Sequence, residues 1–184
     1  GIYHAGGDEV NYHCWENSSR IKAWMTAQGF QKPQQAYAYF LNRVAKRVRP
    51  ATPMFWQDAF EGAEPATPLP SDAIIQFYRT GPIAKAAQTH RVVFAVNHQW
   101  GLDIHTRSKT WDQFYSVDPT AGLNATAAKN LIGGEACVWT VTFEASIISS
   151  VMWPRLLAVS ERLWSPLALT QNATRSEALS RLKW

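Results

Sequence analysis

The chain alternates short apolar segments with segments of helical pattern, and each apolar segment ends in polar or aromatic residues. Such an alternation predicts a parallel sheet with helical crossovers. Barrel enzymes gather their sites at the C-terminal ends of the strands, so the repeated endings favour a (β/α) barrel over a doubly wound sheet. The endings are "GGDE" (6–9), "WQD" (56–58), "FYR" (77–79), "NHQW" (97–100) and "CVWT" (137–140).

The number of candidate strands indicates a partial barrel. A complete (β/α)8 TIM barrel has eight strands and about 250 residues. This chain has 184 residues, and we expect an α/β fold that forms the C-terminal half of such a barrel. Residues 1–7 are expected to be the end of a buried strand that runs into a loop. Further strands are predicted at 52–60, 73–79, 91–100 and 131–139.

Helices are predicted from apolar residues that recur at the 3.6-residue period. One covers 17–28, and Gly29 follows at the position typical of a helix end. The clearest helix runs from Pro33, which suits a first helical position, to Pro50. The remaining predictions are a weak helix near 82–90, a helical pattern over 145–164 with Pro154 near its middle, and a long irregular excursion over 101–130 of the kind that often carries function.

Composition places the chain among globular domains with a substantial apolar core, because 46% of its residues are hydrophobic and only 17% are charged. The formal charge is +4, but the basic residues are scattered, and the densest run, "AKRVR" (45–49), has helical spacing. We interpret this run as a solvated helix face and expect no nucleic-acid partner. No apolar run reaches the roughly 18 residues that a membrane span requires, so no span is predicted.

The cysteines and the glycosylation triplets leave more than one interpretation open. Cys14 and Cys137 are the two cysteines of the chain, and they can pair, remain free, or have partners outside it. Three N-x-S/T triplets begin at Asn17, Asn124 and Asn172. Such triplets also arise by chance, so they favour a secretory route only modestly.

The stretch "YHAGGDEVNYHCW" (3–15) places two carboxylic acids, Asp8 and Glu9, directly after two glycines. Neighbouring side chains of a strand point to opposite faces, so adjacent acids serve one site only if the backbone turns. Gly6 and Gly7 permit that turn. A polar turn without chemistry is the plainer interpretation of most acidic pairs, but the flanking glycines and aromatic residues favour a site.

A glycosidic bond is cleaved by an acid that protonates the leaving oxygen and a nucleophile on the other face of the sugar. Two adjacent residues cannot bracket a sugar in this way, so a second carboxylate acting as nucleophile fits poorly. In substrate-assisted hydrolysis the 2-acetamido carbonyl of the sugar attacks its own anomeric carbon. Asp8 then orients the amide and stabilises the developing positive charge, and Glu9 acts as the acid.

Other chemistries are less favoured by the motifs. A metal site built from His4, Asp8 and His13 matches no common zinc spacing, and we predict no metal or other cofactor. A Ser/His/Asp site lacks the G-x-S-x-G elbow, and a cysteine nucleophile needs a better motif than the one around Cys137.

Aromatic residues stand at three strand ends, at Trp56, Tyr78 and Trp139. Large aromatic side chains usually belong to the core, and this interpretation is preferred for any one of them alone, as for Trp100 and Trp111. Their repetition at strand ends instead favours a box of aromatic faces around a sugar ring or its acetamido methyl group.

These residues together resemble the β-N-acetylhexosaminidases of glycoside hydrolase family 20. The segment "HAGGDEV" with Cys14 and Trp15 is similar to the family's His-x-Gly-Gly-Asp-Glu signature. The segments "FWQDAF", "IIQFYR", "GGEACVW" and "WPRLLAVSERLWS" follow in the family's order and at similar spacing. The resemblance covers residues 1 to about 166, and such a linked set of motifs is highly specific.

The resemblance implies a glycosidase that removes terminal N-acetylglucosamine or N-acetylgalactosamine from glycans with retention. It implies one partial catalytic domain over 1–184, from about the end of barrel strand 4 to helix 8. Glu9 matches the family's general acid/base, and Asp8 matches the residue that orients the acetamido group. The substrate-binding matches are Trp56 and Trp139 as walls of the acetamido pocket, Tyr78 in the place of a third tryptophan, and Asp103 near the outer hydroxyls.

The chain departs from the family at two positions. Gly101 stands where a tyrosine usually holds the acetamido oxygen, and Val141 stands where a glutamate usually binds outer hydroxyls. These departures motivate an alternative, a carbohydrate-binding protein that has lost turnover; a noncatalytic interaction module is a third and weaker interpretation. The resemblance also implies a lysosomal or secreted protein and allows a homodimer. Because Cys14 matches a cysteine that pairs upstream, a bond to Cys137 is not expected.

Overall fold

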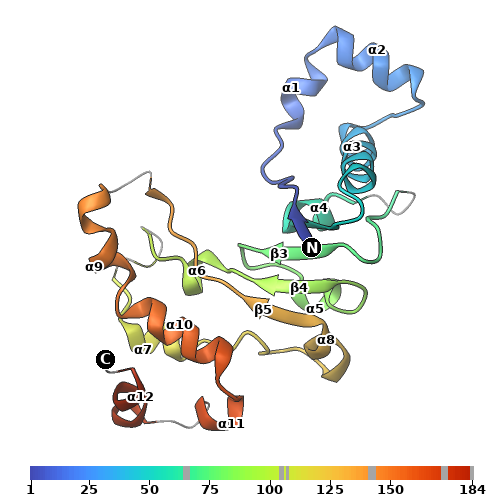
Figure 1. The fold of residues 1–184 in the computed structure, drawn as a ribbon. Helices are drawn as coiled ribbons and strands as arrows, with labels where there is room; N and C mark the ends of the chain where they lie inside the picture. Colours follow the sequence, from blue (N-terminus) through green and yellow to red (C-terminus); the bar gives the residue numbers. More distant parts are fainter. Residues whose placement is uncertain (64–66, 104–105, 107, 141–143, 171–173, 183–184) are drawn as a thin grey trace. The chain divides into compact units, whose positions relative to one another are not determined.

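The computed structural model describes all residues except 64–66, 104–105, 107, 141–143, 171–173 and 183–184 (Figure 1). Its strands are β1 (Ile2–His4), β2 (Thr52–Trp56), β3 (Ile74–Phe77), β4 (Arg91–Phe94) and β5 (Leu131–Gly134), and they follow one another in the sheet in this order. The chain divides into two compact units, and the boundary passes through β3 and β4. Unit one is Gly1–Gln76 with Gly81–Val92, and unit two is Phe77–Thr80 with Val93–Trp184.

Helices connect the strands within the described residues. In unit one they are α1 (Tyr12–Glu16), α2 (Ser19–Ala27), α3 (Pro33–Arg47), α4 (Gln57–Glu61) and α5 (Ile83–Ala86). In unit two they are α6 (Asn97–Trp100), α7 (Trp111–Tyr115), α8 (Ala125–Asn130), η3 (a 3₁₀ helix, Ala145–Ile147), α9 (Ile148–Met152), α10 (Arg155–Trp164), α11 (Leu167–Thr170) and α12 (Arg175–Arg181). None of these helices is long and apolar enough to cross a membrane.

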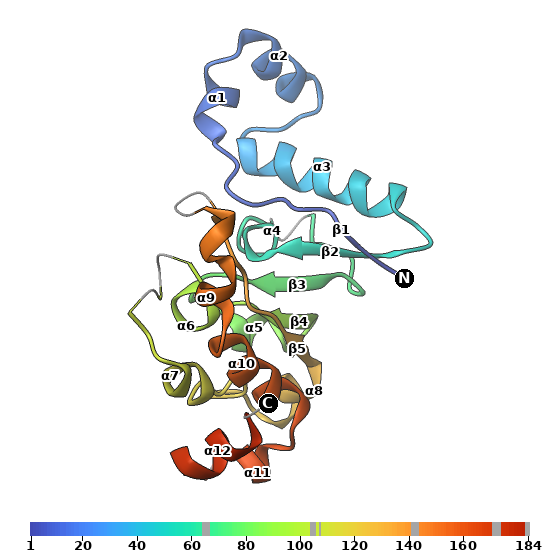
Figure 2. The same ribbon diagram turned by 60° about the vertical axis from the view of Figure 1, so that its left-hand side comes forward.

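The sheet of unit one is parallel, with Ile2 opposite Thr52 and Met54 opposite Ile74. All four residues of β3 are buried. Helix α3 runs beside β1 and β2 (Figure 2), and its buried positions, which include Tyr37 and Leu41, recur on one face. The parallel pairing and this amphipathic crossover helix confirm the sequence-based expectation for the first two strand–helix repeats.

Several predicted features of unit one need correction. Strand β1 is exposed rather than buried, with Ile2 at 58% and Tyr3 at 54% exposure, because it is the first strand of the sheet and pairs on one side only, with β2. Phe40, which follows the 3.6-residue apolar period of the helix predicted from Pro33 to Pro50, is expected on its buried face but is 58% exposed. The strand predicted over 52–60 ends at Trp56, where α4 begins. The short helix α1 was not predicted.

The same shortening occurs in unit two. The strand predicted over 91–100 ends at Phe94, and "NHQW" forms α6. The strand predicted over 131–139 ends at Gly134. Among its described residues, the excursion over 101–130 contains helices α7 and α8, which begin after Thr110 and Asn124; such side chains favour helix starts because they accept a free backbone N–H.

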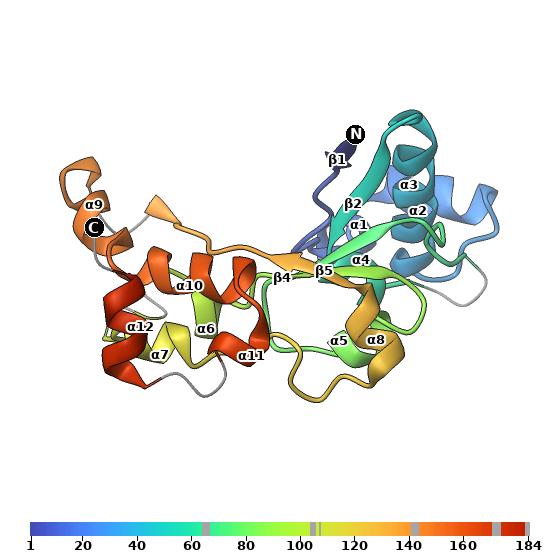
Figure 3. The same cartoon turned by 60° about the horizontal axis from the view of Figure 1, so that its bottom comes forward.

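Pro154 divides the predicted helix over 145–164. Proline has no backbone N–H to donate and its ring collides with the preceding helical turn, so a helix rarely continues through it. Accordingly α9 ends at Met152 and α10 begins at Arg155. Helix α10 packs on α7 (Figure 3), and the buried residues of unit two include Trp100 and Phe114.

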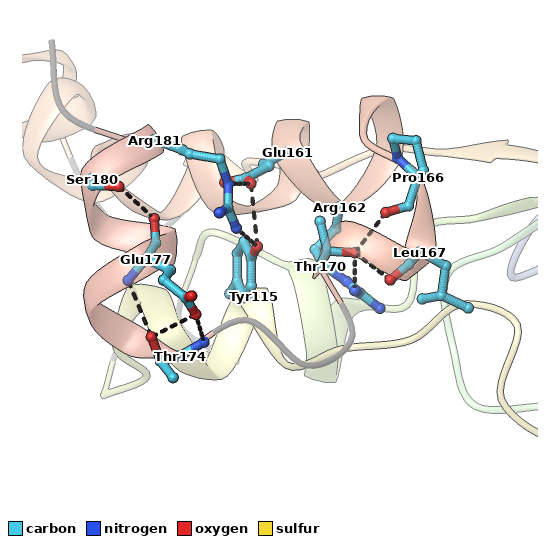
Figure 4. A network of polar contacts seen from close by, with 10 residues as sticks. All are labelled: Tyr115, Glu161, Arg162, Pro166, Leu167, Thr170, Thr174, Glu177, Ser180 and Arg181. Carbon is cyan, nitrogen blue, oxygen red and sulfur yellow. Dashed lines mark hydrogen bonds and ion pairs between the residues drawn. The ribbon is translucent and has the colours of Figure 1, made fainter.

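A polar network joins α12 to α7 and α10 (Figure 4). Arg181 donates from Nη2 to the hydroxyl of Tyr115 at 2.9 Å and from Nε to the carboxylate of Glu161. The Tyr115 hydroxyl in turn donates to Glu161 at 3.2 Å. The network therefore attaches the last helix through one carboxylate and one phenol.

Candidate active site

The glycines before the acid pair form the turn that the sequence predicts. Gly6 and Gly7 have φ of +68° and +95°, which is backbone that glycine adopts without steric cost. The Gly6 carbonyl accepts a hydrogen bond from the Trp56 amide at 3.0 Å, and the Gly7 carbonyl accepts one from the Tyr37 hydroxyl. The turn is therefore anchored to β2 and to α3.

Glu9 follows this turn in an unusual backbone conformation. Its φ is +53°, and no other non-glycine among the described residues has a positive φ. Left-handed backbone at such a residue costs about 1–3 kcal/mol and persists only where the surroundings impose it; it clusters at active sites. Asp8 and Glu9 are both exposed, so the anchored turn presents two carboxylates to solvent at the end of β1.

Replacing Gly7 with alanine is expected to destabilise the protein by about 1–3 kcal/mol, because φ +95° does not suit a Cβ. The new Cβ also meets Leu41 Cδ2 at 3.2 Å and the Tyr37 hydroxyl at 3.3 Å. Gly29→Ala is the matched control, since φ is +74° and nothing lies within 4 Å. Urea unfolding measures both variants; equal losses would show that the contacts at Gly7 contribute nothing.

His4 connects the turn to the neighbouring strands. The Gly6 amide donates to His4 Nδ1 at 3.1 Å, so the other ring nitrogen, Nε2, carries the proton and donates to Gln76 Oε1 at 3.0 Å. The imidazole also lies 4.9 Å from the Trp56 ring, at an interplanar angle of 59°. Unit one thus brings together the acid pair's turn, His4 and Trp56.

Sequence reasoning considered His4 only as a metal ligand and missed this connecting role. The signal was a histidine and a glutamine at the ends of β1 and β3, two strands that both pair with β2. His13 contacts its own helix end, with Nε2 2.9 Å from Asn17 and Nδ1 3.9 Å from Glu16. The part of the chain that the structure describes holds no group of three or more His, Cys, Asp or Glu side chains arranged for a metal ion.

Asp103 lies in a closed turn of unit two and is 3% exposed. The Leu102 amide donates to the Cys137 carbonyl at 2.8 Å, and the Thr106 amide donates to the Asp103 carbonyl at 3.3 Å. The Thr106 hydroxyl donates to the Gly101 carbonyl. These bonds attach the turn that carries Asp103 to the segment that follows β5.

The three aromatic strand-end residues are not fully buried. Trp56 is the last residue of β2 and is half-buried. Tyr78 follows β3, its carbonyl accepts from the Asn97 amide at 2.8 Å, and the Arg79 guanidinium lies 4.9 Å from its ring centroid. Trp139 is 49% exposed. Trp100, in contrast, is a core residue with 0% exposure.

Gly101 is required by the backbone at its position. A Cβ there would lie 2.6 Å from the Asn97 carbonyl oxygen and 3.1 Å from the Asn97 Cα. A tyrosine cannot take this place unless the end of α6 moves. The second departure, Val141, lies outside the described residues.

Cys137 is a poor nucleophile in this environment. Burial and the neighbouring negative charge of Glu135 raise the pKa of its thiol to about 12, and Sγ donates to Glu135 Oε1 at 3.5 Å. The thiolate, which is the reactive form, is therefore scarce at neutral pH. Cys14 and Cys137 are both free thiols.

The strands are parallel, follow one another in sequence order and are each followed by a helix. Polar and aromatic residues stand at their carboxyl ends. These features define the chain as part of a (β/α) barrel. Residues 1–167 match the family described as "Glycosyl hydrolase family 20, catalytic domain". The chain belongs to glycosyl hydrolase family 20, which confirms the resemblance and the fold class expected from the sequence.

Relatives named beta-hexosaminidase align with most or all of this chain. Beta-hexosaminidase 1 of Arabidopsis thaliana is 31% identical over 189 residues, covering 100% of this chain and 34% of its own length. The beta subunit of the beta-hexosaminidase of Felis catus is 30% identical over 177 residues, covering 91% and 32%. The chain thus spans about a third of the length of these relatives.

Solved structures agree on the fold. An exo beta-N-acetylglucosaminidase of this family from Vibrio harveyi, in complex with N-acetylglucosamine, has a TM-score of 0.81 at 22% identity, over 97% of this chain and 30% of that chain. A chitobiase from Flavobacterium johnsoniae has a TM-score of 0.76 at 22% identity, over 99% and 28%.

Proposed function

We propose that this chain carries catalytic residues of a glycosidase that removes terminal, non-reducing N-acetylhexosamine residues by substrate-assisted retaining hydrolysis. The observation that carries the proposal is the anchored Gly6–Gly7 turn, which presents Asp8 and Glu9 side by side at a strand end. Membership of the family and relatives named beta-hexosaminidase support it.

The chemistry follows from the adjacency of the two acids. The acetamido oxygen attacks the anomeric carbon, the glycosidic C–O bond breaks, and Glu9 gives its proton to the leaving oxygen. Asp8 accepts a hydrogen bond from the amide N–H and stabilises the positive charge of the cyclic intermediate. Glu9, now a carboxylate, takes a proton from the water that opens this ring at the anomeric carbon, so two inversions give retention.

The residues proposed for sugar binding are Trp56 in unit one and Tyr78, Asp103 and Trp139 in unit two. The aromatic faces suit the apolar face of a sugar ring and the acetamido methyl group. The Asp103 carboxylate suits hydroxyl donors, because a carboxylate accepts charge-assisted hydrogen bonds. The substrates proposed are glycans that end in N-acetylglucosamine or N-acetylgalactosamine.

We also infer that the protein is a lysosomal or secreted glycoprotein and that it forms a homodimer. The triplet at Asn17 supports the first inference, because its side chain lies at the exposed end of α1 next to His13. Homodimerisation is supported by the family resemblance alone.

The proposal is tested by substrates that differ in one group. The full-length polypeptide is expected to hydrolyse an aryl N-acetyl-β-glucosaminide and to leave the corresponding aryl β-glucoside, which has a hydroxyl in place of the acetamido group, essentially intact. A thiazoline analogue of the cyclic intermediate is expected to inhibit competitively. Equal cleavage of the two glycosides would contradict participation of the acetamido group.

A second candidate is a carbohydrate-binding protein without turnover, and the Gly101 backbone favours it. Removal of one charge-stabilising donor in an oxyanion hole costs about 2.7–4 kcal/mol, or 10²–10³ in rate. A missing tyrosine hydroxyl is expected to act in the same direction, unless Tyr78 supplies a hydroxyl. Calorimetric binding of N-acetylglucosamine without hydrolysis of either glycoside would establish this candidate.

A further inference from the structure

Arg155, the first residue of α10, is a buried cation, only 9% exposed. It donates from Nε to the Val151 carbonyl at 3.0 Å, and from Nη2 to the same carbonyl. Its guanidinium carbon lies 5.3 Å from the Phe114 ring centroid. Burial lowers the pKa of Arg155, and the negative charge of Asp103 acts against that effect. Burying a charge costs free energy unless the charge is hydrogen-bonded or paired, so the partners of the Arg155 guanidinium indicate what this residue does.

The remaining donors of Arg155 reach the two sides of the Asp103 turn. Nη1 donates to the Thr106 carbonyl at 3.0 Å, and Nη2 lies 3.5 Å from the Leu102 carbonyl. Leu102 precedes Asp103 directly, and Thr106 closes the turn through the Asp103 carbonyl. The guanidinium therefore contacts carbonyls on both sides of Asp103, a residue that is 3% exposed.

We propose that Arg155 is a positioning residue for substrate binding. It donates to the carbonyls of Leu102 and Thr106 and places its positive charge near Asp103. These contacts hold the Asp103 carboxylate in the orientation that accepts hydrogen bonds from the sugar's outer hydroxyls. The inference deepens the proposed function and depends on it. Arginine is suited to this task because its planar fork donates in several fixed directions, whereas the lysine ammonium is a compact point charge on a flexible stem.

Arg162 provides a matched control on the same helix. It also donates to a main-chain carbonyl, from Nε to Val117 at 2.9 Å, and its guanidinium carbon lies 6.0 Å from an aromatic ring, that of Tyr115. Arg162 also donates from Nη1 to the Thr170 hydroxyl at 2.6 Å (Figure 4). Arg162→Met thus removes a partly buried cation with similar kinds of contact, all of them separate from the Asp103 turn.

The test measures KM and kcat of the full-length polypeptide for an aryl N-acetyl-β-glucosaminide and its 4-deoxy and 6-deoxy analogues. Hydrogen bonds to a charged group contribute enough for a rise of about 10-fold or more in KM when one is lost. Arg155→Met is expected to raise KM by about 10-fold, with a smaller change in kcat. We define the deoxy penalty as the ratio of KM for a deoxy analogue to KM for the parent glycoside. Arg155→Met is expected to reduce this penalty for the analogue that has the larger penalty in the unsubstituted enzyme. The KM and the deoxy penalty of Arg155→Lys are expected to lie between those of Arg155→Met and those of the unsubstituted enzyme.

The Arg162 control shows what the loss of a purely structural arginine does. Arg162→Met is expected to lower the thermal midpoint while leaving the deoxy penalty unchanged. Arg155→Met combined with Asp103→Asn is expected to be no worse in KM than Asp103→Asn alone, because the positioned group is already gone. Additive losses, or an undiminished deoxy penalty in Arg155→Met, would overturn the inference. If that variant fails to fold, the same two readouts on Arg155→Lys decide.

The outcome for the unsubstituted enzyme separates this inference from the proposed function. If it binds the sugar without turnover, dissociation constants from calorimetry replace KM and the same comparisons apply. If it neither binds nor cleaves, the proposed function fails and the role of Arg155 fails with it. If it cleaves normally and the Arg155 and Arg162 variants behave alike, only the role of Arg155 is refuted.

Discussion

Glu9→Gln is expected to lower kcat/KM for hydrolysis by about 10²–10⁴-fold, the range over which a positioned general acid contributes. Glutamine keeps the size of the side chain but cannot donate a proton to the leaving oxygen. The loss is expected to be larger for a disaccharide than for a nitrophenyl glycoside, because a nitrophenolate leaves without full protonation. Initial rates of the full-length polypeptide on both substrates measure the effect.

The control for this experiment is Glu16→Gln. Glu16 is an exposed carboxyl at the end of α1 in the same unit, and its Oε2 lies 3.9 Å from Nδ1 of His13. We expect rates indistinguishable from those of the unsubstituted enzyme. A Glu9→Gln variant that retains full activity on the disaccharide would remove Glu9 as the acid, whereas equal losses on both substrates would indicate a role other than protonation.

Trp100→Ala is expected to lower the free energy of unfolding by about 3–5 kcal/mol, the usual cost of truncating a buried large aromatic residue. Trp100 is 0% exposed, and its indole N–H donates to the Phe114 carbonyl at 3.1 Å. Its ring lies 5.0 Å from that of Phe94. A Cβ at Gly134 would come within 2.8 Å of Trp100, so the indole fills the space that this glycine leaves. Truncation therefore leaves a cavity and removes one of the hydrogen bonds that the Phe114 carbonyl accepts.

Trp164→Ala serves as the comparison, because Trp164 is 89% exposed and surface substitutions usually stay within about 0.5 kcal/mol. Urea unfolding followed by circular dichroism gives both values. Trp100→Phe, which keeps a ring but loses the N–H, is expected to fall between them. If Trp100→Ala and Trp164→Ala unfold at the same urea concentration, the core of unit two does not depend on this indole.

The parts of the site that were predictable depend on residues close together in the sequence. The Gly6–Gly7 turn was predictable because glycine and adjacent acids reveal it within four residues, and the structure confirms it. The strands that end at Trp56 and Phe94 were predicted too long. Their aromatic and apolar residues suit a strand or a short buried helix equally, so only packing decides where one becomes the other. The sugar-binding roles of Trp56, Tyr78, Asp103 and Trp139 stay predictions.

The sequence by itself determined the alternation of strands and helices, the family, and the acid pair, because each depends on spacing within a few residues or on the order of motifs. Only the structure showed that Gly101 has no room for a side chain and that Arg155 contacts Thr106, 49 residues earlier in the chain. The first depends on how the backbone leaves α6, and the second depends on backbone atoms of a distant segment that folding brings to α10. A sequence pattern records which side chains are present, but it does not record which carbonyl a distant guanidinium will reach.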